Sequence, residues 1–389
     1  MRIVDVNGFY APRGGGVRAY VDWKLAAAAR AGHEVLVIAP GKKNAVEPRD
    51  GGAIHWIASP SFPLDRRYRM LIDANAVHRL LDALKPDVVE ASSPWRTASI
   101  VASWRGDADR HWVMHADPLA AYAYRWFGRI AHREAIDRWF SWWWRYLRQT
   151  APAFDSILCA NVALAARFRA GGITNARVCR FGVQPGIFSP DLRDLGLRAE
   201  LCRSCEIGDD ALLLLGVGRH SSEKKWSLVI DAVVAAAAKR PMGLILVGEG
   251  RESPTLNRVI SGNPHIRLLA PIEDRDALAR LMASVDGLVH GCDAETFCFV
   301  AAEAAASGIP IVAPRLGGAA HAAAGGVVHR FGGDDPASVM RAIGALAADR
   351  HGARIRATRA AREGVRTMDD HFTQLFAAYS RGNRLRAAA

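Results

Sequence analysis

Residues 212–225 read LLLLGVGRHSSEKK, and this stretch decides how the second half of the chain folds. The apolar run Leu212–Val217, ended by Gly218, predicts a short buried strand followed by a loop. In parallel α/β sheets, ligands bind beside the carboxyl ends of the strands. Arg219 and Lys224 then lie in one loop at that edge, where a guanidinium and an ammonium can neutralise a diphosphate. A solvated basic loop is the alternative.

The same strand-and-loop pattern recurs along nearly the whole chain, where short β-branched runs alternate with alanine-rich stretches. This alternation is typical of parallel sheets with crossover helices, so the predicted fold class is α/β. The strands expected in the first half are Arg2–Val6, Glu34–Ile38, Ile54–Ile57, Asp87–Ala91, Trp112–His115, Ser156–Cys159 and Arg177–Phe181. Those expected in the second half are Leu212–Val217, Gly243–Val247, Ile266–Leu269, Gly287–Val289 and Ile309–Ala313.

A chain of 389 residues exceeds the size at which one hydrophobic core usually keeps growing, so two domains are expected. The Pro- and Gly-rich stretch 184–191, QPGIFSPD, suits a linker. We therefore predict one domain over residues 1–188 and a second over 189–367. An amphipathic helix over 368–380 is expected to pack back on the first domain.

Composition limits the classes of protein that the chain can represent. Hydrophobic residues make up 50% of the chain and charged residues 23%, which fits a globular protein, and no run reaches the ~18 apolar residues of a membrane span. The N-terminus shows no secretory signal, so a cytoplasmic location is expected. The formal net charge of +12 predicts attraction to polyanions such as anionic lipid, nucleic acid or sugar diphosphates.

The six cysteines are scattered, and only Cys202 and Cys205 form a C-x-x-C pair. A structural zinc site needs a second pair, or histidines at ligand spacing, and neither is near. Two reduced thiols beside a helix are therefore expected, with no metal bound there.

The first loop ends in PRGGG at residues 12–16, before a helix expected over Val17–Arg30. Such a loop lets backbone amides approach a ligand at the positive end of a helix. Its glycines formally match a dinucleotide fingerprint. They come too long after the first strand, however, and the second strand ends without the acid that binds a ribose, so a dehydrogenase is excluded.

Residues 295–310 read ETFCFVAAEAAASGIP and place one carboxylate in a loop, Glu295, and a second on the following helix, Glu303. The alanines around Glu303 indicate a buried, tightly packed helix in which an unpaired charge would be costly. Both carboxylates are therefore expected to face one pocket. The backbone amides of Phe297, Cys298 and Phe299 lie at the start of the helix, where they can bind hydroxyl or phosphate oxygens. An ordinary exposed glutamate on an alanine-rich helix is the alternative.

Taken together, these motifs resemble family four of the retaining glycosyltransferases. The resemblance rests on the glutamate pair, the loop 218–224, the motif 247–250 (VGEG), Gly317-Gly318, the N-terminal stretch 9–18 and the linker 181–190. It covers nearly the whole chain.

The resemblance implies the GT-B fold, in which two Rossmann-like domains face each other across a deep cleft. It implies that Arg219 and Lys224 bind the donor diphosphate, Glu303 the nucleoside ribose and Glu295 the donor hexose. The implied catalytic residues are His115, Arg219, Lys224 and Glu295, and the implied donor-binding residues are Gly15, Gly16, Gly218, Arg219, Lys224, Phe297, Cys298, Phe299 and Glu303. The implied reaction is a front-face displacement that needs no metal and no cofactor beyond the nucleotide sugar.

Three positions depart from the pattern of this family. Cys298 replaces the usual glycine, Gln184 replaces the usual acid of the linker, and His321 stands where a glutamate often follows the glycine pair. Cys298 affects the sugar contact, although its backbone amide is retained. The four charged donor residues are unchanged.

Residues 124–148 interleave indole rings with arginines, as membrane-interface segments do. The candidates for contact with a membrane or acceptor are Arg125, Trp126, Trp142, Trp143, Trp144 and Arg145. The alternative is a core helix whose tryptophans pack inward. With the net charge, the segment favours a lipid-linked or glycan acceptor and peripheral contact with an anionic membrane, and the donor motifs argue against a nucleic-acid partner.

Within the family, the N-terminal half is most similar to bacterial mannosyltransferases that use GDP-mannose on glycolipids. A UDP-glucose or other UDP-hexose donor stays open, because the shared motifs do not fix the base or the hexose. The rival functions are a sugar-nucleotide epimerase of the same architecture and a non-catalytic protein that binds anionic lipid.

Overall fold

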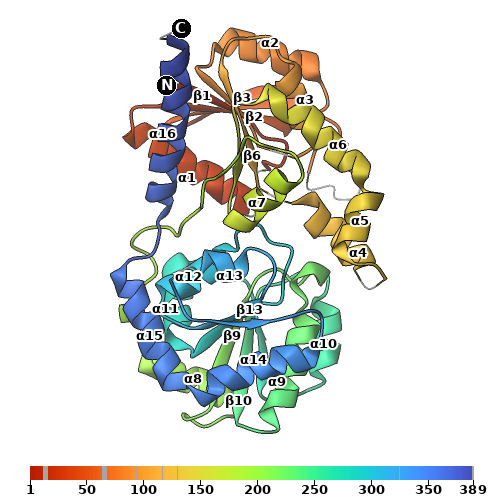
Figure 1. Ribbon diagram of the computed structural model, residues 1–389. Helices are drawn as coiled ribbons and strands as arrows, with labels where there is room; N and C mark the ends of the chain where they lie inside the picture. The colour runs from red at the N-terminus through yellow and green to blue at the C-terminus, as the bar shows by residue number, and fades with distance from the viewer. Residues whose placement is uncertain are drawn as a thin grey trace. The chain divides into compact units, whose positions relative to one another are not determined.

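The computed structural model describes residues 1–387 except 12–15, 64–67, 93, 116, 129 and 324. The chain forms two compact units, one made of Met1–Arg180 with Met368–Ala389 and the other of Phe181–Thr367 (Figure 1). The boundary between the two units therefore falls after Arg180. The sequence analysis placed it after residue 188, within the proline-rich stretch 184–191. The last helix, α16 (Met368–Ala387), belongs to the first unit and packs against α1 (Gly16–Arg30).

The first unit is built on an eight-stranded sheet of order β3-β4-β2-β1-β5-β6-β7-β8. Every neighbouring pair is parallel except β3 and β4, which form an antiparallel edge. The strands are β1 (Arg2–Val6), β2 (Glu34–Gly41), β3 (Ala45–Arg49), β4 (Gly52–Ala58), β5 (Val88–Ala91), β6 (Asp109–Met114), β7 (Ser156–Cys159) and β8 (Ala176–Val178).

The second unit is built on a six-stranded sheet of order β11-β10-β9-β12-β13-β14, in which all paired strands are parallel. The strands are β9 (Leu212–Val217), β10 (Met242–Val247), β11 (Ile266–Leu269), β12 (Gly287–Val289), β13 (Ile311–Pro314) and β14 (Val328–Phe331). The strand order reverses direction between β9 and β12. This switch point is where the loops that follow two neighbouring strands diverge and leave room for a ligand.

Helices cover both faces of each sheet in the way that parallel crossovers require. In the first unit they are α1, α2 (Ala74–Leu84), α3 (Arg96–Ser103), α4 (Tyr124–Phe127), α5 (Arg133–Trp139), α6 (Ser141–Thr150), α7 (Val162–Ala170) and α16. In the second unit they are α8 (Leu195–Ser204), α9 (Trp226–Ala237), α10 (Ser253–Ile260), α11 (Arg275–Ser284), α12 (Phe299–Ala306), α13 (Ala319–Ala322), α14 (Pro336–Ala348) and α15 (Arg350–Glu363).

The strands missed by the sequence analysis, β3 and β14, are both at sheet edges. The β3 strand contains Pro48 and two charged residues, and β14 reads Val-His-Arg-Phe. These two edge strands each have one side open to solvent and carry no continuous apolar run that a sequence pattern could detect. Both sheets otherwise agree with the predicted alternation of strands and helices.

A buried charge cluster joins α1 to the first sheet. Lys24 of α1 lies between Asp5 of β1 and Glu90 of β5, with its ammonium 3.2 Å from the Asp5 carboxylate and in an ion pair with Glu90. Tyr379 of α16 donates a hydrogen bond to Glu90. All three charged side chains are fully buried. The charges therefore satisfy one another and fix both helices on the switch point of this sheet.

Candidate functional site

The loop that follows β9 is shaped by two glycines with positive φ. Gly218 has φ 151° and donates its backbone N–H to Val247 O at 3.0 Å. A Cβ atom on Gly248 (φ 148°) would lie 2.1 Å from Gly218 O, so only glycine fits there. The loops after β9 and β10 therefore pack closely against each other. After Gly218 the chain forms a short 3₁₀ turn, Ser222–Lys224, and then enters α9.

That turn directs Lys224 toward the loop after β12, where its ammonium forms an ion pair with Glu295. The two residues come from the two sides of the switch point, and their side chains are 15% and 22% exposed. Burial disfavours both charged forms, but each charge stabilises the other. The pKa of Lys224 is consequently raised, and that of Glu295 is lowered to about 2. Both groups are charged at neutral pH and reachable from solvent.

Three further side chains of the β12–α12 segment gather at Glu295. His290 is buried, with Nε2 3.6 Å from Glu295 Oε1 and 3.6 Å from Cys298 Sγ. Burial lowers the pKa of His290 to about 4 and raises that of the Cys292 thiol to about 11. Neutral imidazole and thiol groups therefore lie behind the charged pair, and the sequence analysis assigned no role to His290 or Cys292.

Cys298 is the residue before α12 and has φ 77°, in the left-handed region that favours glycine. This backbone conformation gives the physical reason why glycine suits the position. The side chains of Phe297 and Phe299 pack with Phe181, with ring centroids 5.0–5.8 Å apart. Packing of these rings orients the first turn of α12. Because the two phenylalanine side chains pack against Phe181, the groups of residues 297–299 that can bind a donor are their backbone amides.

Glu303 lies on α12 with 6% of its surface exposed, surrounded by buried alanines. Its carboxylate accepts a 2.6 Å hydrogen bond from Arg275 Nη2, at the start of α11. Burial raises the pKa of Glu303, and the Arg275 guanidinium opposes the shift. Arg275 also lies 5.0 Å from the centre of the Phe188 ring. Sequence analysis missed Arg275, because nothing in its local sequence marks it.

Arg219 is the most exposed residue of the group, with 64% of its side chain in solvent and Glu223 3.7 Å away. Its backbone carbonyl accepts a hydrogen bond from Trp226 Nε1 at 3.0 Å, which anchors the loop while leaving the guanidinium outside. An exposed guanidinium and a partly buried ammonium in one loop form a suitable receptor for an anion.

In the first unit, His115 follows β6 and packs edge-on against Tyr20 of α1, with ring centroids 4.8 Å apart. Burial lowers the pKa of His115 to about 4, so the imidazole is neutral at neutral pH. Gly16 is the first residue of α1. Gly15 lies outside the described residues.

The aromatic segment of the first unit divides into a buried and an exposed set. Trp143 and Trp144 are 1% and 8% exposed and belong to the hydrophobic core. Their prediction as membrane contacts is wrong, since a helix turns 100° per residue and cannot direct three successive side chains outward. Trp126 and Trp142 are 59% and 53% exposed. Arg145 is exposed, and the side chain of Arg125 lies outside the description.

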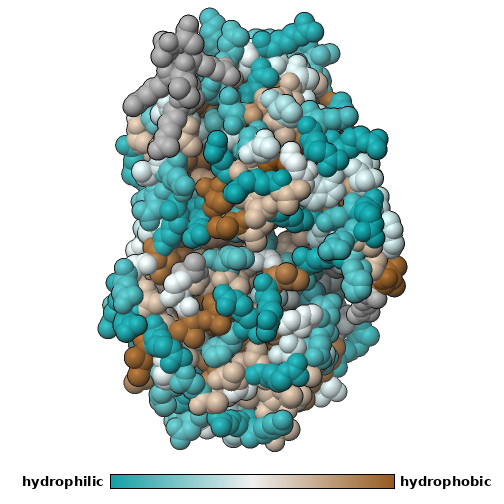
Figure 2. Space-filling view, viewed as in Figure 1, coloured by the Kyte–Doolittle hydropathy of each residue, from teal (hydrophilic) through white to brown (hydrophobic). Residues whose placement is uncertain are grey.

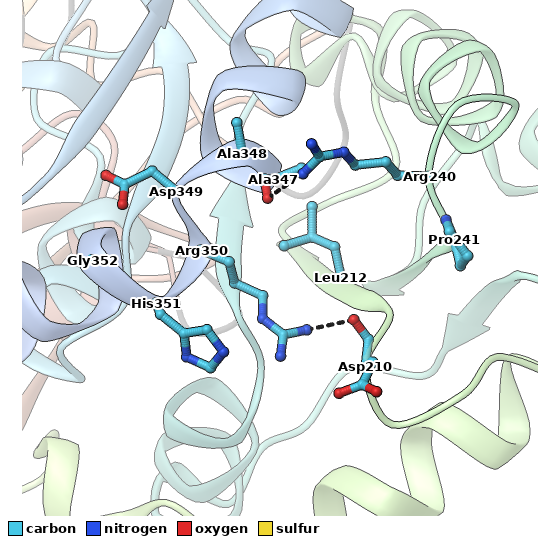
Figure 3. A pocket seen from close by; sticks show the side chains of 10 residues that line it. All are labelled: Asp210, Leu212, Arg240, Pro241, Ala347, Ala348, Asp349, Arg350, His351 and Gly352. Carbon is cyan, nitrogen blue, oxygen red and sulfur yellow. Dashed lines mark hydrogen bonds between the residues drawn. The ribbon is translucent and has the colours of Figure 1, made fainter.

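A cavity of about 420 Å³ in the second unit lies at the other end of the sheet (Figure 3). It is lined by Leu212 at the start of β9, Pro241 just before β10, and the turn between α14 and α15. Arg240 and Arg350 line it but donate their hydrogen bonds to the carbonyls of Ala347 and Asp210. Because these cations bind the protein's own backbone at the amino ends of the strands, the cavity is not the ligand site.

Comparison with known proteins agrees with this fold and geometry. The structure is similar to sucrose-phosphate synthase from Thermosynechococcus elongatus, with a TM-score of 0.76, 18% identity and complete coverage of both chains. Anabaena HepE in complex with UDP-glucose gives a TM-score of 0.69 at 16% identity and covers 98% of this chain and 100% of the other. The fold is thus that of the GT-B glycosyltransferases.

The sequence matches the family model "Glycosyl transferase 4-like domain" over residues 15–183 and "Glycosyl transferases group 1" over residues 211–349. A GDP-mannose-dependent alpha-(1-6)-phosphatidylinositol dimannoside mannosyltransferase from Mycobacterium tuberculosis is 30% identical over 317 residues, which cover 81% of this chain and 80% of that protein. The chain belongs to the group 1, family 4-type glycosyltransferases. The predicted enzyme class and two-domain fold are confirmed.

Proposed function

We propose that this enzyme transfers mannose from GDP-mannose to a lipid-linked or glycan acceptor with retention of configuration. The observation that carries this proposal is the Lys224–Glu295 pair at the switch point of the second sheet, which is reachable from solvent and whose lysine shares a loop with the exposed Arg219. The donor preference is supported by the GDP-mannose-dependent relative, and a UDP-hexose is the alternative suggested by the HepE complex.

In this proposal, Lys224 and Arg219 bind the diphosphate and stabilise the negative charge that develops as it leaves. The leaving phosphate oxygen takes the proton of the acceptor hydroxyl on the same face, so the sugar retains its configuration. Glu295, held ionised by Lys224, accepts hydrogen bonds from hexose hydroxyls, and Glu303 does so from the ribose. Phosphate charge is then neutralised by side chains, and we expect no metal cofactor.

The backbone amides at residues 297–299 add donors at the positive end of α12. We propose that Gly15, Gly16 and His115 of the first unit also take part in donor binding and in the reaction. A neutral His115 suits that role because an imidazole without charge can accept as well as donate a hydrogen bond to a sugar hydroxyl.

A screen of nucleotide sugars by thermal stabilisation tests this donor assignment directly. Ligands that bind only the folded state raise the melting temperature in proportion to the logarithm of their concentration. We expect GDP-mannose to stabilise the enzyme most, and release of GDP on addition of a glycolipid acceptor. Stabilisation by UDP-glucose alone would show that the donor is UDP-glucose and not GDP-mannose. Hydrolysis or epimerisation of the nucleotide sugar without transfer would contradict the proposed glycosyl transfer.

For the acceptor side, we propose that the exposed aromatic residues of the first unit contact an anionic membrane. Trp126, Ile130, Trp139 and Trp142 are 53–76% exposed. Figure 2 shows apolar surface at the turn between α4 and α5 beside polar surface. Indole rings at the headgroup level, together with arginines on anionic lipid, give the chemistry of interfacial binding. No helix among the described residues is long and apolar enough to span a bilayer.

Binding to vesicles of anionic phospholipid at low salt tests the membrane proposal. We expect Trp126→Ala/Trp142→Ala to reduce binding at least several-fold while the fold is retained. Exposed Val234 and Leu269 of the second unit, each changed to Ser, form the matched control. Equal binding of the tryptophan variant and the control would reject the surface.

A further inference from the structure

The side chains behind Glu295 form a ligand set of their own. One ligand atom from each of His290, Cys292 and Glu295 lies within 4.8 Å of the others. The Cys298 thiol is not one of these three but contacts the same imidazole, with Sγ 3.6 Å from His290 Nε2. Within the described part of the chain, His290, Cys292 and Glu295 are the cluster of His, Cys and acidic residues that meets the spacing for a metal ion. The proposed transfer reaction uses neither His290 nor Cys292.

Two distances from the His290 imidazole match the edges of a tetrahedral zinc site. Zinc binds sulfur at about 2.3 Å and imidazole nitrogen at about 2.0–2.1 Å, so two such ligands on a tetrahedron lie about 3.5 Å apart. His290 Nε2 lies 3.6 Å from Cys298 Sγ and 3.6 Å from Glu295 Oε1, close to the edges of that tetrahedron. Two sulfurs, one imidazole and one carboxylate favour zinc over magnesium or calcium, which prefer oxygen ligands.

The backbone supports this reading of Cys298. The left-handed region is unfavourable for an L-residue and is open to glycine. Cys298 has φ 77°, and this conformation holds its thiol against the imidazole of His290. His290 and Cys292 are each 1% exposed, whereas Glu295 is 22% exposed on its side chain, so an ion reaches the cluster past Glu295.

We propose that His290, Cys292, Glu295 and Cys298 form an inhibitory site for a thiophilic divalent cation such as Zn²⁺. Binding releases the two thiol protons to solvent and forms two zinc–thiolate bonds, one zinc–nitrogen bond and one zinc–oxygen bond. It also takes the Glu295 carboxylate out of its ion pair with Lys224 and away from the donor hexose, while the net charge of the cluster stays the same. The inhibition rests on the proposed function, whereas the binding of the ion does not.

Metal binding is tested on the full-length protein with Co²⁺ as a spectroscopic probe in place of Zn²⁺. We expect one equivalent to give the sulfur-to-cobalt charge-transfer absorption of a thiolate site, displaced by Zn²⁺. Cys292→Ala removes one ligand without touching the proposed donor residues, and we expect it to lose the absorption. Cys298→Gly, which suits the left-handed backbone, is the second variant, should Cys292→Ala fold poorly. The double variant Cys202→Ala/Cys205→Ala removes two buried thiols elsewhere and is the matched control.

Inhibition is tested by mannosyl transfer from GDP-mannose with increasing Zn²⁺. Nucleotide in solution binds some zinc, but it does so equally for every variant. We expect wild type and the Cys202/Cys205 variant to lose activity, and Cys292→Ala to keep it. Absence of the cobalt absorption in wild type, or equal zinc inhibition of Cys292→Ala, would overturn the inference. Cobalt binding through Cys292 in a protein that transfers no sugar would instead uphold the metal site and reject the proposed function.

Discussion

Each unit of the molecule places a lysine against carboxylates at the switch point of its sheet, but the two sites differ in exposure. Lys24, Asp5 and Glu90 are fully buried, and Tyr379 of α16 completes the cluster. Lys224 and Glu295 are 15% and 22% exposed. A lysine–carboxylate pair that helices bury completely can only stabilise the fold. A pair that solvent can reach can also bind a ligand, because a ligand group can replace one of the two partners.

The strongest test of this contrast is removal of the buried cation. Lys24→Met keeps much of the side-chain volume and leaves Asp5 and Glu90 without a countercharge, so we expect a loss of about 3–5 kcal/mol in the free energy of unfolding. Urea denaturation measures it. Arg30→Met, which breaks the exposed pair between α1 and Asp369, is the control and should cost less than about 1 kcal/mol. Equal effects of the two variants would contradict a structural role for Lys24.

Substitution at the solvent-accessible Lys224–Glu295 pair should change enzyme activity more than stability. Lys224→Ala removes the ammonium proposed to stabilise the leaving diphosphate, and we expect kcat to fall by about 10²–10³ with the protein still folded. Steady-state transfer kinetics with GDP-mannose measure the loss. The neighbouring Lys225→Ala, whose ammonium pairs with Asp293 and Asp334, is expected to stay within a few-fold of wild type. Similar losses in both variants would mean that the loop as a whole, not Lys224, is required.

The buried His115 of the first unit should make the stability of the protein depend on pH. Burial lowers the pKa of His115 from 6.5 to about 4, so the unfolded chain binds a proton that the folded protein does not. Stability from this group is present above pH 6.5 and is lost as the pH falls toward 4. We expect a loss of about 1–2 kcal/mol between pH 7 and pH 5.

Urea denaturation at both pH values should show a smaller decrease in His115→Gln than in wild type. His132→Gln, at an exposed position, is the matched control and should keep the wild-type decrease. An unchanged decrease in His115→Gln would show that His115 is protonated in the folded protein as well.

The smallest expected effect concerns Arg275, which we regard as a positioning residue for Glu303. Without its guanidinium the pKa of Glu303 rises further, so the carboxylate proposed to bind the ribose becomes protonated at low pH. Because Glu303 is retained but loses its charged hydrogen bond, we expect KM for the donor to rise several-fold in Arg275→Gln, with little change in kcat.

The pH profile separates this effect from a general loss of structure. The KM of Arg275→Gln should improve as the pH rises, and Arg275→Lys should restore part of the binding. Arg280→Gln, on the same helix, breaks an exposed pair with Asp194 and serves as the control. A fall in kcat with unchanged KM would contradict the assignment.

The sequence predicted most of the fold because each strand of a parallel sheet leaves a pattern in a short stretch of sequence. A strand buried on both faces is a continuous apolar run, and the loop after it carries glycines and charges, as residues 212–225 do. The edge strands β3 and β14 were not predicted in this way, and neither was the division of the chain at Arg180, which depends on contacts far apart in the sequence. The family and enzyme class followed from the motifs, and the comparisons confirmed both.

The sequence by itself determined which residues carry charge at the switch point of the second sheet, including Arg219, Lys224 and Glu295. Only the tertiary structure decided their partners. It joined Lys224 to Glu295 and Glu303 to Arg275, and it buried Trp143 while exposing Trp142. A local pattern fixes the order of strands and loops, whereas ion pairs and burial depend on residues that only packing brings together.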